Sequence, residues 1–279
     1  MNILITGSTG FVGKNVVSFI SKEHSLFLIN KKKKNRHKIK NIISVKSDIN
    51  LSQQVFKKII NFNPDLLIHL AWEGIPDYSK KNSEKNLIKQ KLFFQKIFKI
   101  HSIKKIIITG SCSEHQNKEY ITSKYFVDSK IKIKNFVKQE CLKNKISFIW
   151  IRLFYVYGRY QHKRSLIPKI INSLKKNTKF KILNPHIKND YINVADVVNF
   201  IKMNLNLRYA NYECDLGSSL AFKNIDIYNF IKREIMNLKN IKLKIFKKKK
   251  YFISSRKNLI ISGWKPTIKI EDGLRRLLN

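Results

Sequence analysis

The sequence has few cysteines, few prolines and little negative charge. Its 279 residues include 3 cysteines, 5 prolines and 18 acidic residues. The cysteines, Cys112, Cys141 and Cys214, are far apart and lack the spacing of metal ligands, so we expect neither a disulfide framework nor a metal site. A chain of this length can bury a core large enough to fold without such supports.

The sequence also lacks an apolar run long enough to cross a membrane. Its most apolar stretch, Ile146–Tyr157, is short and is interrupted by Arg152, whereas a spanning helix needs about 20 apolar residues. The first predicted strand begins at Asn2, so we expect no signal peptide. These features predict a cytoplasmic protein with no membrane partner.

Positive charge is in large excess, with 57 Lys and Arg residues and a net charge of +39. Such a charge is typical of proteins that bind nucleic acid. Here the lysines are spread along the chain among many Asn and Ile residues, and the dense runs are confined to 31–34 and 247–250. A genome rich in A/T codons explains this pattern, so we expect no specific nucleic-acid partner, only weak, salt-sensitive binding to polyanions.

Glycine is scarce, with 9 residues, yet three of them lie near the start of the chain. The segment Thr6–Gly13 (TGSTGFVG) follows the apolar run Ile3–Ile5 and precedes a stretch with helical spacing of apolar residues. A strand, a glycine-rich turn and a helix N-terminus together present backbone N–H groups that suit a pyrophosphate. The segment therefore predicts a dinucleotide site formed by Gly7, Thr9, Gly10, Phe11, Val12 and Gly13.

Apolar runs alternate with helical stretches through the first half of the chain. The predicted strands are Ile3–Thr6, Leu26–Ile29, Ile42–Val45, Leu66–Leu70, Ile106–Thr109 and Ser147–Leu153. This alternation predicts an α/β fold, a Rossmann-type doubly wound parallel sheet covered on both faces. Ligands of such sheets bind beyond the carboxyl ends of the strands, so polar residues just past each strand are candidates for the site.

The pattern changes after residue 157. We expect a dinucleotide-binding domain over 1–157 and a smaller α+β substrate-binding lobe over 158–279, with the helix 194–205 and the strand 212–216 rejoining the first domain. Helices are also predicted over 165–174, 226–236 and 270–278, and a half-buried strand over 241–246.

Seven short motifs occur in an order that resembles the extended short-chain dehydrogenases/reductases, in particular the nucleotide-sugar epimerase, dehydratase and reductase group. The resemblance runs from end to end of the chain. The motifs are Thr6–Gly13, Asp48-Ile49, His69-Leu70-Ala71, Gly110-Ser111-Cys112, Arg152–Gly158, Asp190–Asp196 and Ser262–Pro266. A further segment, Trp72–Tyr78, resembles a loop of some deoxysugar 4-reductases of this group.

The resemblance implies a nicotinamide dinucleotide as cofactor. It assigns the pyrophosphate to the three glycines and the adenine amino group to Asp48, for which a helix N-cap role is the alternative. Tyr155 would line the nicotinamide pocket or pack against the sheet. The resemblance extends the cofactor site to Asn30, Lys31, Ile49, Leu70, Ala71, Trp72 and Lys130. Asn30-Lys31 stands where an acidic residue usually marks NAD, which favours NADP over NAD.

The resemblance also implies a catalytic Tyr-x-x-x-Lys pair on the helix after the fifth strand, with Ser111 at the end of that strand. Tyr120 and Lys124 match the letters, but Lys124 stands 28 residues before Arg152, where the family needs little more than twenty. Lys130 stands 22 residues before Arg152, which fits, but the residue four positions earlier is Phe126. We favour Lys130, with Tyr125 or Tyr120 as substitutes for the missing tyrosine.

We expect from this resemblance an NAD(P)-dependent 4-keto reductase or C4 epimerase that acts on a nucleotide-activated sugar for surface-polysaccharide synthesis. The alternative, motivated by Phe126, is a dinucleotide-binding protein without turnover. Arg159, Lys163 and Arg164 are candidate diphosphate contacts. The resemblance allows a homodimer built on the helices after the fourth and fifth strands, where Phe93, Phe94 and Ile97 serve either the interface or the core.

Overall fold

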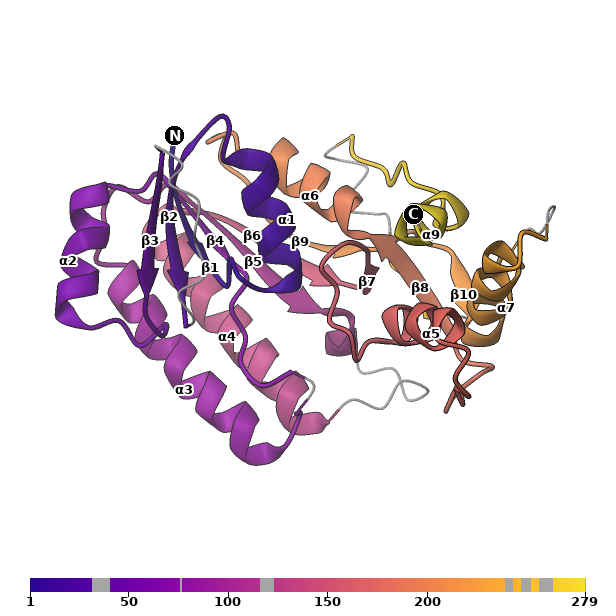
Figure 1. Cartoon of the computed structure of the whole chain (residues 1–279). Helices are drawn as coiled ribbons and strands as arrows, with labels where there is room; N and C mark the ends of the chain where they lie inside the picture. The colour runs from indigo at the N-terminus through magenta and orange to yellow at the C-terminus, as the bar shows by residue number, and fades with distance from the viewer. Residues whose placement is uncertain are drawn as a thin grey trace. The chain divides into compact units, whose positions relative to one another are not determined.

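The computed structural model describes residues 1–31, 41–75, 77–115, 123–238, 243–246, 252–255 and 263–278 (Figure 1). The chain divides into two compact units, Met1–Arg152 with Ile201–Glu213, and Leu153–Phe200 with Cys214–Asn279. The sequence-based boundary at 157 therefore falls a few residues inside the second unit.

The first unit is built on a parallel sheet, as the sequence predicts. The seven strands of this sheet run in the order β3-β2-β1-β4-β5-β6-β9, and the pairs β1–β2, β1–β4, β2–β3 and β4–β5 are parallel. The strands are β1 (Asn2–Thr6), β2 (Ser25–Asn30), β3 (Ile42–Lys46), β4 (Leu66–His69), β5 (Lys105–Ser111), β6 (Ser147–Leu153) and β9 (Asn211–Leu216).

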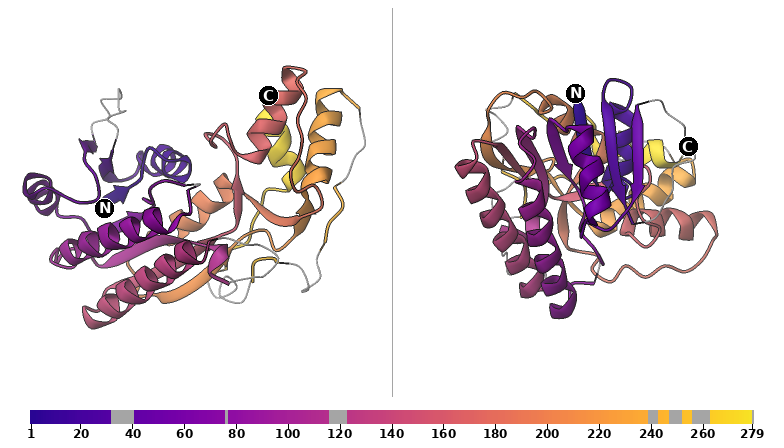
Figure 2. Two further views of the ribbon diagram at one scale, coloured as in Figure 1. Left: turned by 90° about the horizontal axis from the view of Figure 1, so that it is seen from below. Right: turned by 90° about the vertical axis from the view of Figure 1, so that its left-hand side faces the viewer.

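Helices cover this sheet and supply its core. They are α1 (Phe11–Ile20), α2 (Gln53–Phe62), α3 (Lys80–Ile97) and α4 (Lys124–Lys143), with the short helix η1 (Cys112–His115) after β5. Buried apolar residues of α2, α3 and α4 pack together against the sheet, and α3 and α4 lie side by side (Figures 1 and 2). Phe93, Phe94 and Ile97 are buried in this core, so the interface alternative is wrong for these three residues.

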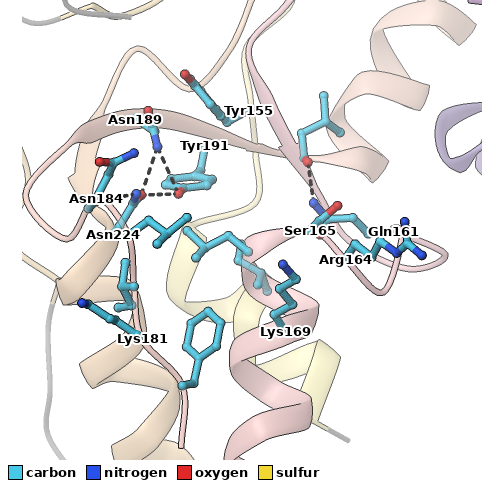
Figure 3. Close-up of a pocket in the computed structure, with 16 residues that line it drawn as sticks. Tyr155, Gln161, Arg164, Ser165, Lys169, Lys181, Asn184, Asn189, Tyr191 and Asn224 are labelled. Atoms are coloured by element: carbon cyan, nitrogen blue, oxygen red, sulfur yellow. Dashed lines mark hydrogen bonds between the residues drawn. The ribbon is translucent and has the colours of Figure 1, made fainter. Parts of the chain in front are cut away.

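The second unit contains a smaller sheet in the order β10-β8-β7, formed by β7 (Tyr155–Tyr157), β8 (Lys188–Asn193) and β10 (Ala221–Lys223). Its helices are α5 (Leu166–Lys175), α6 (Val194–Met203, of which the end from Ile201 belongs to the first unit), α7 (Asn224–Ile235) and α9 (Ile270–Leu278). Side chains of β8 and α7 contact one another in this unit (Figure 3).

Buried carboxylates hold the loops of the second unit. Asp190 accepts hydrogen bonds from Ser218 and Ser254 at 2.6–2.9 Å, and Asp196 accepts from the backbone and hydroxyl of Thr267. Of the strand predicted over 241–246, residues 241 and 242 lie outside the described residues, and Phe246 forms an isolated bridge with Ala221.

Candidate active site

The glycine-rich turn between β1 and α1 depends on the absence of side chains at two positions. Gly7 has φ +71°, and a Cβ atom there would lie 2.8 Å from the backbone nitrogen of Ala71. A Cβ on Gly13 would lie 2.7 Å from Ser8 Cα and closer still to the Gly7 carbonyl oxygen. Gly10 is the N-cap of α1 and forms no side-chain cap. The first turn of α1 therefore presents its backbone N–H groups to a ligand.

Asn30, at the end of β2, holds this turn in place. Its Oδ1 atom accepts hydrogen bonds from the Ser8 hydroxyl at 2.6 Å and from the Thr9 backbone N–H at 3.1 Å, and its side chain is buried. The sequence singled out Asn30 as the residue that replaces an acidic one. The structure gives it a second role that the sequence does not signal, which is to position the turn.

A cavity of about 290 Å³ opens beside the turn, at the carboxyl ends of β1, β2 and β4. Ten of the predicted cofactor residues line it: Gly7, Thr9, Gly10, Asn30, Lys31, Asp48, Ile49, Leu70, Ala71 and Trp72. The lining also includes residues that the sequence analysis missed, namely Ile29, Ser47, Glu73 and Gly74. Phe11, Val12 and Gly13 follow on α1, Lys130 is on α4, and Tyr155 is in the second unit.

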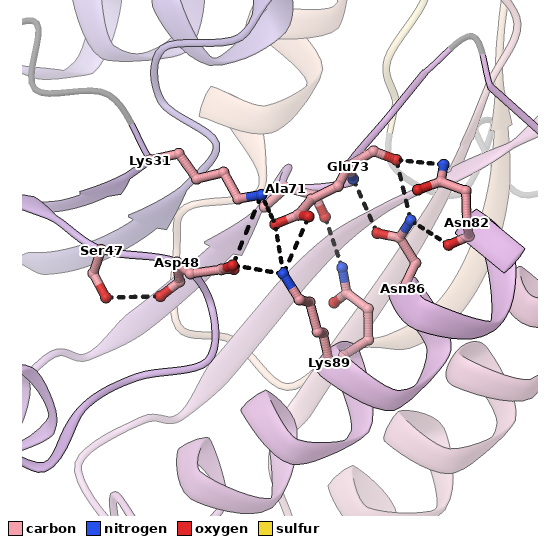
Figure 4. A network of polar contacts seen from close by, with 9 residues as sticks. Lys31, Ser47, Asp48, Ala71, Glu73, Asn82, Asn86 and Lys89 are labelled. Atoms are coloured by element: carbon pink, nitrogen blue, oxygen red, sulfur yellow. Dashed lines mark hydrogen bonds and ion pairs between the residues drawn. The ribbon is translucent and has the colours of Figure 1, made fainter.

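Two lysines and two carboxylates form a network on the wall of this cavity (Figure 4). Lys89 Nζ lies 2.6 Å from Asp48 Oδ2 and 3.2 Å from Glu73 Oε2. Lys31 Nζ lies 2.6 Å from Glu73 Oε1 and 3.8 Å from Asp48 Oδ2. Partial burial raises the pKa of Asp48, but the bonds and charge of Lys89 outweigh it and hold the pKa below its usual value. Asp48 is therefore ionised near neutral pH.

Asp48 has one oxygen left for a ligand. Ser52, not Asp48, caps α2 by accepting from the Val55 N–H, so the N-cap alternative for Asp48 is wrong. Its Oδ1 atom is buried and has no hydrogen-bond partner among the residues that the structure describes. A buried carboxylate oxygen without a donor is costly, and an amino group of a bound ligand would satisfy it.

His69, the last residue of β4, is a packing residue. Its Nδ1 atom lies 2.9 Å from the Thr6 hydroxyl, and its ring contacts Phe93 and Phe94. Burial, reinforced by the charge of Lys130, lowers the pKa of His69 to about 3. The imidazole is therefore neutral and does not exchange protons near neutral pH.

Ser111 and Lys130 lie close to the carboxyl end of β5. The Ser111 backbone N–H donates to Glu114 at 2.8 Å, and its Oγ atom accepts from the Ser113 N–H at 3.2 Å. No described residue accepts a hydrogen bond from the Ser111 hydroxyl, so its proton can be donated to a ligand. Lys130 Nζ donates to the Thr109 carbonyl at 3.1 Å and lies 4.0 Å from the centroid of the Trp72 ring. Burial lowers the pKa of Lys130 to about 8.

The structure places the candidate catalytic tyrosines, and the phenylalanine that replaces one of them, in different surroundings. Phe126 is buried one helical turn before Lys130 on α4. Tyr125 is 47% exposed and lies beside Lys80. Tyr120 lies outside the described residues. Lys124 is exposed at the start of α4, so it is Lys130 that reaches the strand of Ser111.

The second unit has a cavity of its own, of about 620 Å³ (Figure 3). Three cations line it, Arg164, Lys169 and Lys181, and no carboxylate does among the described residues. Asn189 and Tyr191 of β8 both donate to Asn224 Oδ1, at 3.0 and 2.7 Å. Of the candidate diphosphate contacts, Arg164 lines the cavity, whereas Arg159 and Lys163 do not.

Within the described parts of the chain, no group of His, Cys, Asp and Glu side chains is arranged to hold a metal ion. In those same parts, none of the helices has the length and apolar character that crossing a bilayer requires.

The pattern of the NAD dependent epimerase/dehydratase family matches residues 3–212. CDP-abequose synthase of Salmonella muenchen is 23% identical, over 99% of this chain and 97% of that protein. dTDP-4-dehydro-6-deoxyglucose reductase of Escherichia coli is 24% identical, over 99% and 96%. The solved UDP-N-acetylglucosamine 4-epimerase of Methanobrevibacter ruminantium has a TM-score of 0.83 at 19% identity, covering 99% of this chain and 96% of that one, which shows a shared fold.

Proposed function

Because this chain belongs to the NAD dependent epimerase/dehydratase family, we propose that it is an NAD(P)-dependent enzyme that acts on a nucleotide-activated sugar. We propose 4-keto reduction or C4 epimerisation as the reaction, in the synthesis of surface-polysaccharide precursors. The observation that carries the proposal is the glycine turn that opens onto the 290 Å³ cavity. The wall of this cavity holds Asp48, whose Oδ1 atom has no hydrogen-bond partner among the described residues.

The residues of the first unit fit a dinucleotide. The N–H groups at the start of α1 would hold the pyrophosphate, and Asp48 Oδ1 would accept from the adenine amino group. The dinucleotide, when bound, supplies or accepts a hydride. Lys130 adds a fixed, desolvated positive charge near the end of β5, and the Ser111 hydroxyl would donate a hydrogen bond to the sugar oxygen that reacts.

The preference between the two cofactors depends on Lys31. Its ammonium would favour the 2′-phosphate of NADP, which is the basis of our preference for NADP. Its short contact with Glu73 neutralises much of that charge, which weakens the argument for NADP. We therefore expect the ratio of the NADP affinity to the NAD affinity to depend on the Lys31–Glu73 ion pair.

The cavity of the second unit is proposed as the site for the nucleotide part of the substrate. Arg164, Lys169 and Lys181 give it a positive lining that suits a diphosphate. The amide and phenol groups of Asn189, Tyr191 and Asn224 supply polar edges for a base or a ribose.

The test is turnover with a panel of nucleotide sugars. Net loss of absorbance of the reduced cofactor with a 4-keto nucleotide sugar identifies reduction, whereas formation of a C4 epimer without net loss identifies epimerisation. Ser111→Ala should lose turnover and keep dinucleotide binding, while Ser102→Ala, in the loop before β5, should keep both. Binding of dinucleotide without turnover on any sugar would favour the non-catalytic alternative.

A further inference from the structure

Reduction of a ketone needs a proton as well as a hydride, and of the candidates named above, those that the structure describes do not supply one. Phe126 has no ionisable group, Tyr125 is exposed at the surface, and His69 is neutral and buried. Glu114 accepts hydrogen bonds from the Ser111 N–H and the Trp150 indole. The need for another proton donor rests on the proposed function.

Tyr78 is a phenol that faces this region. It lies in the loop between β4 and α3, and its ring centroid is 4.8 Å from that of Phe126, at an interplanar angle of 60°. Phe126 also contacts Trp72 edge-on at 5.6 Å, and Lys130 Nζ lies over the Trp72 ring. Tyr78 therefore belongs to the same aromatic cluster as the buried lysine.

The Tyr78 side chain is partly buried in this cluster. Burial, followed by the electrostatic effect of Cys112, raises the pKa of Tyr78, and Cys112 directly follows Ser111. The Tyr78 hydroxyl has no hydrogen-bond partner within the described part of the chain. A partly buried phenol without a partner can bond to a ligand, and one with a raised pKa stays protonated near neutral pH.

We propose that Tyr78 is the catalytic proton donor in place of a tyrosine at position 126. The carbonyl carbon gains a hydride from the reduced nicotinamide dinucleotide, which is thereby oxidised. The electron pair of the C=O π bond moves to oxygen and takes the Tyr78 hydroxyl proton, which gives the alcohol. The resulting phenolate is protonated again by water, so each turnover consumes one reduced cofactor and one solvent proton.

The first test is substitution. Tyr78→Phe should lower kcat/KM by about 10²- to 10⁴-fold, the usual contribution of a positioned general acid, and leave the affinity for reduced dinucleotide unchanged. Tyr209→Phe, at an exposed tyrosine of the same unit, is the matched control and should keep full turnover. Adding Phe126→Tyr to Tyr78→Phe should restore part of the rate. Full turnover in Tyr78→Phe would overturn the proposal.

The second test does not depend on turnover. Fluorotyrosine placed at position 78 reports the phenol pKa by fluorine NMR, and oxidised dinucleotide should lower that pKa because it adds a positive nicotinamide ring nearby. The same label at position 209 should not respond. If position 78 also does not respond, the proposal is wrong whatever the turnover. If position 78 responds but the wild type reduces none of the sugars, the proposed reaction fails and the placement of Tyr78 beside the nicotinamide stands.

Discussion

Lys130→Met should make the protein more stable at neutral pH while abolishing turnover. Lys130 is 6% exposed, its ammonium donates to one described carbonyl oxygen, and burial lowers its pKa to about 8 from the usual 10.5. Below pH 8 the native protein therefore carries a buried positive charge that the unfolded chain carries in water. Methionine has a similar shape and carries no charge, so it removes this cost.

The magnitude follows from the two pKa values. A pKa of about 8 instead of 10.5 corresponds to about 3 kcal/mol of native-state destabilisation below pH 8. Losing the hydrogen bond to Thr109 and the contact with Trp72 offsets about 1–2 kcal/mol of the gain. We therefore expect Lys130→Met to raise the free energy of unfolding by about 1–2 kcal/mol at pH 7.

The pH dependence carries a definite sign. Because the folded pKa lies below the unfolded one, the unfolded chain holds a proton between pH 8 and 10.5 that native Lys130 lacks. The wild type therefore gains stability as pH rises through this window. Lys130→Met lacks this gain of about 1.4 kcal/mol per pH unit, so its advantage should shrink above pH 8 and reverse near pH 9.

Urea unfolding of both proteins at a series of pH values measures this difference. Lys105→Met is the matched control, since Lys105 is also buried with a pKa lowered to about 8, but at the other end of β5, where it donates to the Asn204 and Asn206 carbonyls. It should show a similar pH dependence with turnover intact. A stability difference between wild type and Lys130→Met that is constant with pH would refute the reasoning.

Four further substitutions test the cofactor site by fluorescence titration with reduced dinucleotide. Gly13→Ala should abolish binding because its methyl group overlaps backbone atoms of the turn, whereas Gly10→Ala, whose Cβ contact is 3.1 Å, should bind more weakly but measurably. Asn30→Ala should weaken binding by about tenfold, because it removes two hydrogen bonds worth about 1 kcal/mol or more together. Glu73→Gln frees Lys31 and should raise the NADPH-to-NADH affinity ratio by about tenfold; an unchanged ratio would separate Lys31 from cofactor choice.

The large sheet could be predicted from the sequence because its strands are continuous apolar runs. Ile3, Leu4 and Ile5 are fully buried in β1, and such runs carry their own signal. The small sheet gives no such signal. β8 reads Lys188-Asn189-Asp190, and its polar residues are buried because distant serines and Asn224 satisfy them. Only the tertiary structure supplies those partners.

The candidate site also has parts that the sequence predicts and parts that only the tertiary structure shows. The glycine turn follows from local backbone geometry. The prediction of Lys130 follows from the family resemblance together with the interval that the family needs before β6. The pairing of Lys89 with Asp48 joins residues 41 positions apart. The contact of Tyr78 with Phe126 joins a residue of the loop before α3 to a residue of α4. No local pattern predicts contacts of that kind, and the sequence analysis missed both.

These contacts bear on the choice between an enzyme and a dinucleotide-binding protein without turnover. Phe126 favours a protein without turnover, because it stands on α4 where the family resemblance implies a tyrosine. A protein that only binds a dinucleotide gains little from a buried ammonium that costs about 3 kcal/mol, and apolar residues of similar size would replace it with a gain in stability. Lys105 has a similarly lowered pKa at the other end of β5, so what distinguishes Lys130 is its position over the Trp72 ring, which lines the cavity of the first unit. Lys130 lies over the Trp72 ring, and Trp72 and Tyr78 both contact Phe126; that combination favours turnover, with the proton donor moved from the helix to the loop.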